Sequence, residues 1–348
     1  MLSRAPKVLN AHEGALHYSV AINLGGDSAR TSHIYNSHDP DTLDPWLGSL
    51  SPVQPGQSVA PLGLLLDVDG PIASPITRSV SEPGLAQSLT LLANAGVPIG
   101  FNTGRSDEFL LQEVLPAMQK HGLKPDAPVW GISEKAGSWF SFAEPTKIEI
   151  DRDLELPLAL RDDLRTLLQT RFSELAFYDE TKHTMVSFEQ HTTISNEYFQ
   201  ARREPMERAV AELIASHGLP YVWEGRPDLN WSPQGYTDSL VVRIDPTIVA
   251  TDIEHVGTGK DTGAERFVRL LNQARVPVPR TWRTMGDSRT DYAMATWLNE
   301  QGYAVAHVDV RPTDGVLDAG VRVLTHTHLI HDEAGAMFFA QWAKHLVR

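Results

Sequence analysis

The chain has 348 residues, of which 41% are hydrophobic and 21% charged, and its formal net charge is −14 at pH 7. The length predicts about two domains, and the composition is typical of a globular protein. The negative charge argues against binding to nucleic acids or anionic membranes, and the absence of cysteine excludes disulfides, thiolate nucleophiles and cysteine-based metal sites. No segment has the roughly 20 apolar residues of a membrane span, and the N-terminus lacks the apolar core of a signal peptide, so we expect a cytoplasmic protein.

Residues 1–59 are predicted to form an N-terminal extension. Residues 15–24 (ALHYSVAINL) have the pattern of a strand. Residues 37–60 are rich in Pro, Asp, Ser and Gly, which is typical of a linker or an irregular segment. A packing segment or a tail is favoured over an active role for this extension.

From residue 60 onward, apolar runs alternate with amphipathic stretches. The helix predicted over 83–95 has Leu85, Leu89 and Leu92 on one face and ends at Gly96. Strands that alternate with helices predict a parallel sheet with right-handed crossovers. We therefore assign 60–145 to an α/β core with a doubly wound sheet. Its other predicted elements are strands at 62–67, 97–103 and 128–133 and a helix at 107–120.

Between residues 146 and 249 this regular alternation stops. Predicted strands at 147–150, 184–189 and 239–244 are mixed with predicted helices at 158–172 and 196–217. This pattern predicts a second, α+β domain inserted into the core. The core is expected to resume at 250–348, with a helix at 262–271 and strands at 281–285 and 303–310.

The run from Leu64 to Gly70 (LLLDVDG) ends an apolar strand in two aspartates. Residues i and i+2 of a strand point to the same side, so Asp67 and Asp69 are expected to converge at the strand end, where open α/β sheets have their ligand crevices. Clustered carboxylates repel each other unless a cation or a proton lies between them. The pair therefore suits Mg²⁺, which prefers carboxylate, water and phosphate oxygens. The alternative is a turn or a helix cap at the strand exit.

Thr103 ends the second predicted strand and is followed by Gly104 and Arg105. The threonine hydroxyl and the following amides can donate hydrogen bonds to a phosphate oxygen, and glycine lets the backbone approach closely. A threonine that caps the next helix explains the same pattern. Arg105 is suited to pair with phosphate or with a carboxylate.

Lys260 follows GTG and starts a predicted helix. The segment is not a P-loop, because Glu254 and Asp261 stand where that motif needs Gly and Ser or Thr. Asp287 and Asp291 are four residues apart after a strand-like run, and aspartates at a helix start are also stabilising in their own right. The negative charge of the whole chain repels a phosphorylated ligand, so cations at the binding site itself are needed to attract such a ligand.

These motifs, Asp-x-Asp-Gly, strand-Thr-Gly-Arg, an isolated Lys and Gly-Asp-Ser-x-x-Asp, resemble in this order those of the haloacid dehalogenase (HAD) superfamily of phosphohydrolases. The resemblance covers about residues 60–310. It implies a Rossmann-like α/β core that carries a cap domain of the C2 type, at 146–249. It also implies a Mg²⁺-dependent phosphatase that acts on a small phosphorylated metabolite, with a phosphorylated sugar favoured.

The resemblance also implies the roles of individual residues. Asp67 would be the nucleophile that forms an aspartyl-phosphate, and Asp69 the general acid and base. The implied metal ligands are Asp67, Asp69 and Asp287, the implied phosphate-binding residues are Thr103, Gly104 and Lys260, and the implied supporting residues are Asp291 and Arg105. Asp261 follows the lysine where the family usually has glycine.

Two alternatives stay open at the level of sequence. A phosphomutase of the same superfamily would return the phosphoryl group to a sugar, and a non-catalytic relative would bind a phosphorylated ligand without turning it over. Candidate ligand contacts in the inserted domain are Lys182, His183, Glu189 and Arg243. We interpret His326, His328 and His331 as structural, because no carboxylate or cysteine stands near them at a metal-site spacing.

Overall fold

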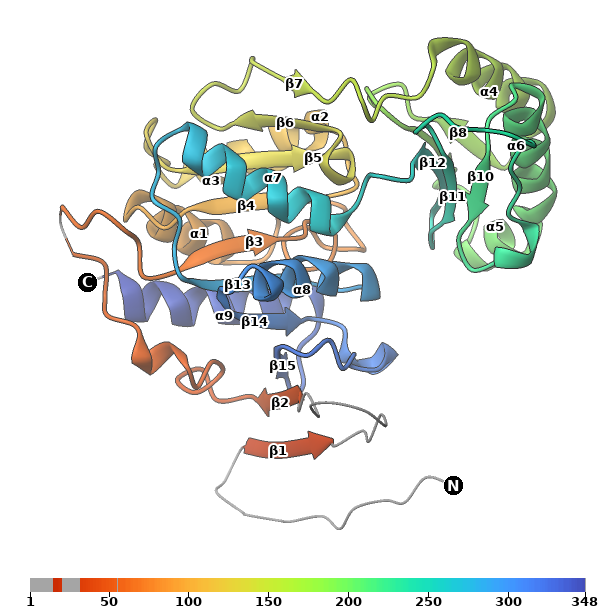
Figure 1. The fold of residues 1–348 in the computed structure, drawn as a ribbon. Helices are drawn as coiled ribbons and strands as arrows, with labels where there is room; N and C mark the ends of the chain where they lie inside the picture. Colours follow the sequence, from red (N-terminus) through yellow and green to blue (C-terminus); the bar gives the residue numbers. More distant parts are fainter. Residues whose placement is uncertain (1–14, 21–31, 55, 348) are drawn as a thin grey trace.

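A computed structural model describes residues 15–20, 32–54 and 56–347, which form two sheets with helices packed on them (Figure 1). The strands of the larger sheet lie in the order β1-β2-β15-β14-β13-β3-β4-β5-β6-β7, and those of the smaller sheet in the order β10-β11-β12-β9-β8. The strands are β1 (Ala15–Val20), β2 (Ser32–Ser37), β3 (Gly63–Leu66), β4 (Ile99–Asn102), β5 (Val129–Ser133), β6 (Ser138–Ser141), β7 (Glu149–Ile150), β8 (Ala176–Tyr178), β9 (Val186–Gln190), β10 (Tyr221–Trp223), β11 (Val242–Pro246), β12 (Ala250–His255), β13 (Thr281–Gly286), β14 (Ala304–Asp309) and β15 (Arg322–His326). The helices are α1 (Leu85–Asn94), α2 (Asp107–Phe109), α3 (Leu115–Lys120), α4 (Leu158–Arg171), α5 (Asn196–Arg202), α6 (Glu204–Ser216), α7 (Lys260–Gln273), α8 (Tyr292–Glu300) and α9 (His331–Leu346).

The larger sheet is doubly wound around β3. From β3 the chain moves outward through β4 and β5, all parallel, and it later returns on the other side of β3 through β13, β14 and β15, also parallel. The strand order thus reverses between β3 and β13. In open α/β sheets such a reversal leaves a crevice at the carboxyl ends of the two strands, where ligands bind.

The apolar run of β3 is explained by burial on both faces of the sheet. Leu64 and Leu66 pack in a cluster with α1 and α9 on one face, whereas Leu65 packs with α7 and α8 on the other. Figure 1 shows these helix pairs on opposite sides of the sheet. The predicted α/β core with a parallel sheet is confirmed.

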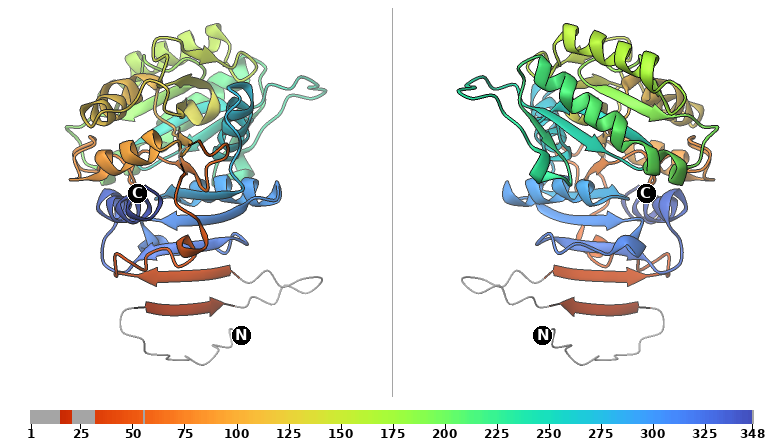
Figure 2. Two further views of the ribbon diagram at one scale, coloured as in Figure 1. Left: turned by 90° about the vertical axis from the view of Figure 1, so that its left-hand side faces the viewer. Right: turned by 90° about the vertical axis from the view of Figure 1, so that its right-hand side faces the viewer.

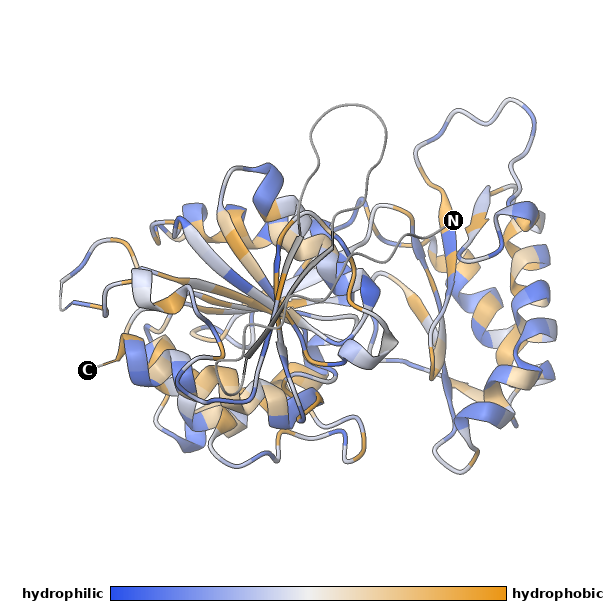
Figure 3. Cartoon of the chain, turned by 90° about the horizontal axis from the view of Figure 1, so that it is seen from below, coloured by the Kyte–Doolittle hydropathy of each residue, from blue (hydrophilic) through white to orange (hydrophobic). Residues whose placement is uncertain are grey.

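The smaller sheet carries α4, α5 and α6 and has a hydrophobic cluster of its own. Figure 3 shows the apolar sides of these helices turned toward the sheet and their polar sides turned away from it. The unit is inserted between β7 and α7, as an α+β insertion was predicted. The sequence placed the return to the core at residue 250, however, whereas β12 still belongs to the smaller sheet, where Ile253 packs in its cluster. The strand was missed because its sequence, ATDIEH, mixes polar and apolar residues.

The N-terminal segment is part of the larger sheet. The strand predicted at 15–24 is β1, with 21–24 outside the described residues, and β2 pairs in parallel with β15 near the other end of the chain. Figure 2 shows both strands at one edge of the sheet. Further along, the buried carboxylate of Asp44 accepts hydrogen bonds from the Arg283 guanidinium and the Trp342 indole. The strand β2 and the segment around Asp44 are therefore packed against the core, and the predicted extension is in part a structural element of it.

Within the described residues, every helix is too short or too polar to cross a lipid bilayer.

Candidate active site

Asp67 and Asp287 lie where the strand order reverses. Asp67 directly follows β3, and its amide donates a hydrogen bond to the Met285 carbonyl of the adjacent β13, 2.8 Å away. Asp287 directly follows β13. The two carboxylates and that of Asp291 offer oxygens that all lie within 4.8 Å of one another. The carboxyl ends of two neighbouring parallel strands thus bring together side chains from distant parts of the sequence.

Lys260, the first residue of α7, joins this cluster from the other side of the insertion. Its Nζ lies 2.6 Å from Asp67 Oδ1 and 2.6 Å from Asp291 Oδ1, and it donates to the Asn102 carbonyl at 2.9 Å. Burial lowers the pKa of this lysine, but the two carboxylates outweigh burial and raise it. The ammonium therefore stays charged.

The cluster holds more negative than positive charge. Burial, reinforced by the Asp291 carboxylate, raises the pKa of Asp287 from 3.8 to about 7, and burial together with Asp291 raises that of Asp67 well above its usual range. His331 Nδ1 lies 3.7 Å from Asp287 Oδ2, so one of the three histidines interpreted as structural faces the site. The three carboxylates face two cations, the Lys260 ammonium and the Arg311 guanidinium, which lies 3.9 Å from Asp287 Oδ2. One negative charge is left in excess, and a cluster of carboxylates with this excess fits a divalent cation that prefers oxygen ligands.

Asp291 is held in place by donors on both of its oxygens. Oδ1 faces Lys260, and Oδ2 accepts from the amide and hydroxyl of Ser288 and from the Asp287 amide at 2.7–3.2 Å. The lysine lowers the pKa of Asp291 against the effect of burial. This carboxylate is better placed to orient Lys260 than to bind a metal.

Gly70 makes room for Asp287. Its φ is +93°, and a Cβ atom at this position would lie 2.7 Å from the Asp287 side chain. Gly104, by contrast, would meet only the Lys135 side chain, at 3.7 Å, and its φ is not in the left-handed region. No neighbouring protein atom therefore requires a glycine at position 104. The expectation that its backbone approaches a phosphate oxygen closely stays a prediction.

Asp69 is engaged by Arg105. The guanidinium Nε and Nη2 donate to the two carboxylate oxygens at 2.9–3.2 Å, and the Asp69 side chain is 43% exposed. The Asp69 carboxylate is not part of the cluster of Asp67, Asp287 and Asp291. The resemblance implied Asp69 as a metal ligand, and that role stays a prediction. The structure places Asp291 in the cluster and pairs the Asp69 side chain with Arg105.

Thr103 is fully buried at the end of β4. Its amide donates to the Ile132 carbonyl, and its hydroxyl accepts from the Arg105 amide at 3.1 Å. Asn102, the residue before it, was not singled out from the sequence. Its carbonyl accepts from Lys260 Nζ, and its side-chain amide donates to the Lys260 carbonyl at 2.8 Å. The sequence could have pointed to Asn102, because it is a polar residue at the end of an otherwise apolar strand. Its contacts show that it positions Lys260.

No protein-family model matches the sequence, and no curated protein matches it at a significant level. Solved structures do resemble it. The C-terminal domain of the trehalose-6-phosphate phosphatase of C. albicans superposes with a TM-score of 0.58 and 11% identity, over 89% of this chain and 98% of the other. A haloacid dehalogenase-like hydrolase of Bacteroides thetaiotaomicron superposes with a TM-score of 0.51 and 12% identity, over 81% of this chain and 99% of the other. The chain has the HAD fold.

The insertion in this HAD fold reaches the loops of the core site. Lys182 is buried, and its Nζ donates to the Gly104 carbonyl. Glu189 Oε2 lies 4.0 Å from Arg105 Nη1, and burial raises its pKa. The other two candidate ligand contacts have protein partners. Arg243 donates hydrogen bonds to the Glu254 carboxylate and the Thr258 carbonyl, and His183 contacts Asp107 of the core. Lys182 and Glu189 are thus the candidates that face the motif loops.

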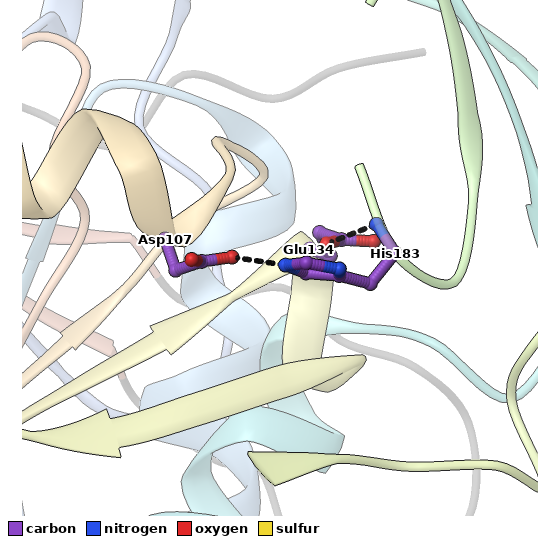
Figure 4. A group of neighbouring side chains, drawn as sticks. All are labelled: Asp107, Glu134 and His183. Atoms are coloured by element: carbon purple, nitrogen blue, oxygen red, sulfur yellow. Dashed lines mark hydrogen bonds and ion pairs between the residues drawn. The ribbon is translucent and has the colours of Figure 1, made fainter. Parts of the chain in front are cut away.

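A second group of potential metal-ligating side chains, Asp107, Glu134 and His183, lies at the junction of the two units (Figure 4). The Glu134 carboxylate accepts hydrogen bonds from the His183 and Thr184 amides and the Thr184 hydroxyl, each at 2.8 Å. His183 Nε2 lies 2.8 Å from Asp107 Oδ1. Because N–H and O–H donors already occupy both Glu134 oxygens, the group is suited to holding the two units together rather than to binding a metal.

Proposed function

We propose that the chain is a Mg²⁺-dependent phosphatase that hydrolyses a small phosphomonoester through an aspartyl-phosphate on Asp67. The contact of Lys260 with Asp67 beside Asp287, where the strand order reverses, supports the proposal most directly. A phosphoryl group seated there would meet a nucleophile, a fixed cation and a metal site at once. Such positioning and charge neutralisation account for most of the catalysis of phosphoryl transfer.

In the proposed reaction, an oxygen of Asp67 attacks phosphorus and the bond from phosphorus to the ester oxygen breaks. Asp69 gives its proton to the departing alkoxide, which leaves as an alcohol. A water molecule, deprotonated by Asp69, then attacks the phosphorus of the aspartyl-phosphate, and Asp67 and inorganic phosphate are released. Asp69 must leave Arg105 for these proton transfers, and its side chain, 43% exposed, is accessible to a substrate and to water. The groups that would bind the phosphoryl oxygens are the Lys260 ammonium and the Thr103 hydroxyl, with the backbone at Gly104.

The carboxylates of Asp67 and Asp287 are the side chains that we propose as metal ligands. When bound, Mg²⁺ would neutralise negative charge on the carboxylates and on the phosphoryl oxygens. Asp291 would keep Lys260 in place, as its contacts indicate.

We propose the unit of the smaller sheet as a cap domain of the C2 type, which selects the leaving group and excludes bulk water. Its place in the chain, between Thr103 and Lys260, supports the assignment. Lys182 and Glu189 would face the alcohol part of the substrate. The likeness to a trehalose-6-phosphate phosphatase domain is consistent with a phosphorylated sugar as substrate.

A screen of phosphate release from a panel of phosphate esters, with Mg²⁺ or with EDTA, tests the proposal. We expect turnover with Mg²⁺, none with EDTA, and a loss of about 10³-fold or more in Asp67→Asn. Circular dichroism checks that the variant is folded, and Asp126→Asn, at an exposed position, is the control. Retained activity in Asp67→Asn would remove Asp67 from the mechanism.

The same screen separates the two alternatives. A phosphomutase would convert a hexose 1-phosphate into a positional isomer without releasing phosphate. A non-catalytic relative would bind phosphate esters and turn none of them over. The carboxylates at positions 67, 69 and 287 favour turnover, since a protein that only binds has no need of a nucleophile and an acid.

A further inference from the structure

Three consecutive residues after β5 have a rare backbone conformation. Glu134, Lys135 and Ala136 have φ values of +52°, +50° and +82°. Non-glycine residues seldom adopt this left-handed region, and they remain there only where the surrounding contacts fix them. The turn lies between the core and the smaller unit, and it contacts both.

The side chain of Lys135 is held by the smaller unit. Its Nζ lies 2.7 Å from Asp245, 3.1 Å from Asp252 and 3.0 Å from Glu254. These carboxylates belong to β11 and β12, the last strands before the chain returns to the core at α7. Burial alone would lower the pKa of Lys135, but the carboxylates raise it, so the buried side chain keeps its charge.

The backbone of Lys135 is held by the two loops of the candidate active site. Its amide donates to the Thr103 carbonyl at 2.9 Å, and its carbonyl accepts from the Gly259 amide at 2.9 Å. Thr103 is a proposed phosphate-binding residue, and Gly259 immediately precedes Lys260. One residue therefore connects the docked unit, through its side chain, to both loops, through its backbone.

We infer that Lys135 is a positioning residue that couples docking of the smaller unit to the placement of Thr103 and Lys260. The inference rests on the proposed phosphatase function. When the smaller unit undocks, the left-handed turn loses both the three carboxylates around Lys135 and the donors from His183 and Thr184 that bind the Glu134 carboxylate. Relaxation toward a common backbone conformation then pulls on the hydrogen bonds to both loops. The site would then be fully assembled only while the smaller unit is docked, when bulk water is excluded.

Lys135→Met tests the coupling in the full chain, with Lys135→Arg as the charge-preserving variant. The control is Lys147→Met, because Lys147 lies just before β7 of the larger sheet and its side chain is 68% exposed. The first readout is kcat and KM for p-nitrophenyl phosphate with Mg²⁺. The second is hydrogen exchange at the amides of Lys135 and Gly259, which report the two backbone hydrogen bonds directly.

We expect Lys135→Met to lower kcat by about 10- to 100-fold, as sub-ångström to ångström misplacement does, with KM changed by less than about twofold. Its two amides should exchange faster, and Lys135→Arg should restore most of both properties. A role in holding the fold alone would not produce this split between kcat and KM or the rescue. Wild-type kcat and exchange in Lys135→Met, or an arginine variant as impaired as the methionine variant, would overturn the inference.

If Lys135→Met does not fold, the double variant Asp245→Asn/Asp252→Asn decides, because it weakens the same contacts from the side of the smaller unit and leaves the turn intact. The same changes in kcat and exchange are expected, and wild-type values would overturn the coupling. If the wild-type chain releases no phosphate from any ester, the proposed function fails. The exchange measurement still decides whether the turn transmits docking to the two loops.

Discussion

Asp287→Asn should stabilise the metal-free protein at neutral and alkaline pH, although it removes a residue of the candidate site. Burial and Asp291 raise the pKa of Asp287 from 3.8 to about 7 in the folded chain. Between these values the folded chain binds more protons than the unfolded chain, so the free energy of unfolding falls as pH rises through this window. At 1.36 kcal/mol per pKa unit the loss is at most about 4 kcal/mol above pH 7. The amide variant carries no such charge and avoids the loss.

Urea denaturation at pH 5 and pH 8, in EDTA and in MgCl₂, measures this effect, with Asp126→Asn as the control. In EDTA the variant should exceed wild type by up to about 4 kcal/mol at pH 8 and by much less at pH 5. Mg²⁺ should stabilise wild type at pH 8 by offsetting the charge of the cluster and should have little effect on the variant. A variant that is less stable than wild type in EDTA at pH 8 would refute the view that burial and the Asp291 charge make the ionised Asp287 carboxylate unfavourable in the folded chain.

Three further results are expected. Lys260→Met leaves two buried carboxylates without their ammonium, so it should lower the free energy of unfolding by about 3 kcal/mol and abolish phosphate release; unchanged urea stability would contradict the buried ion pairs. Gly70→Ala should abolish phosphate release, because its Cβ would overlap the Asp287 side chain, whereas Gly104→Ala should retain activity within about tenfold; equal kcat/KM values for the two variants would refute the steric argument. Arg283→Met leaves the buried Asp44 carboxylate without its guanidinium and should cost about 3–5 kcal/mol in urea titrations, while kcat per folded molecule stays at the wild-type value; a large change in kcat would show that the N-terminal segment acts on the site.

The parallel core was predictable because its strands are buried on both faces and so read as unbroken apolar runs, as β3 does. In the smaller sheet, β8 and β10 were missed because each has only three residues, too few to show a period. The strand β12 was missed because its sequence mixes polar and apolar residues. The helix predicted at 196–217 is two helices, α5 and α6. The break falls just before Pro205, which lacks an amide hydrogen and cannot continue the hydrogen-bond pattern of a preceding turn.

The meeting of Asp67 with Asp287 could be expected from sequence, because carboxyl ends of neighbouring parallel strands share one edge of a sheet. The pairing of Asp69 with Arg105 could not, since it depends on side-chain rotamers rather than on strand position. The left-handed turn at Lys135 was equally hidden. Its sequence, Glu-Lys-Ala, contains none of the residues that favour positive φ, and the hydrogen bonds of Lys135 go to residues far from it in the sequence.

The pairing of β2 with β15 has a consequence for the order in which the protein is built. Ile34 lies opposite Val323, so on the ribosome β2 is made tens of seconds before its partner at about 5–20 residues per second. Until then it presents an unsatisfied hydrogen-bonding edge, the kind of surface on which nascent chains aggregate. Chains that stop before residue 322 never gain this partner, and premature termination should yield insoluble fragments.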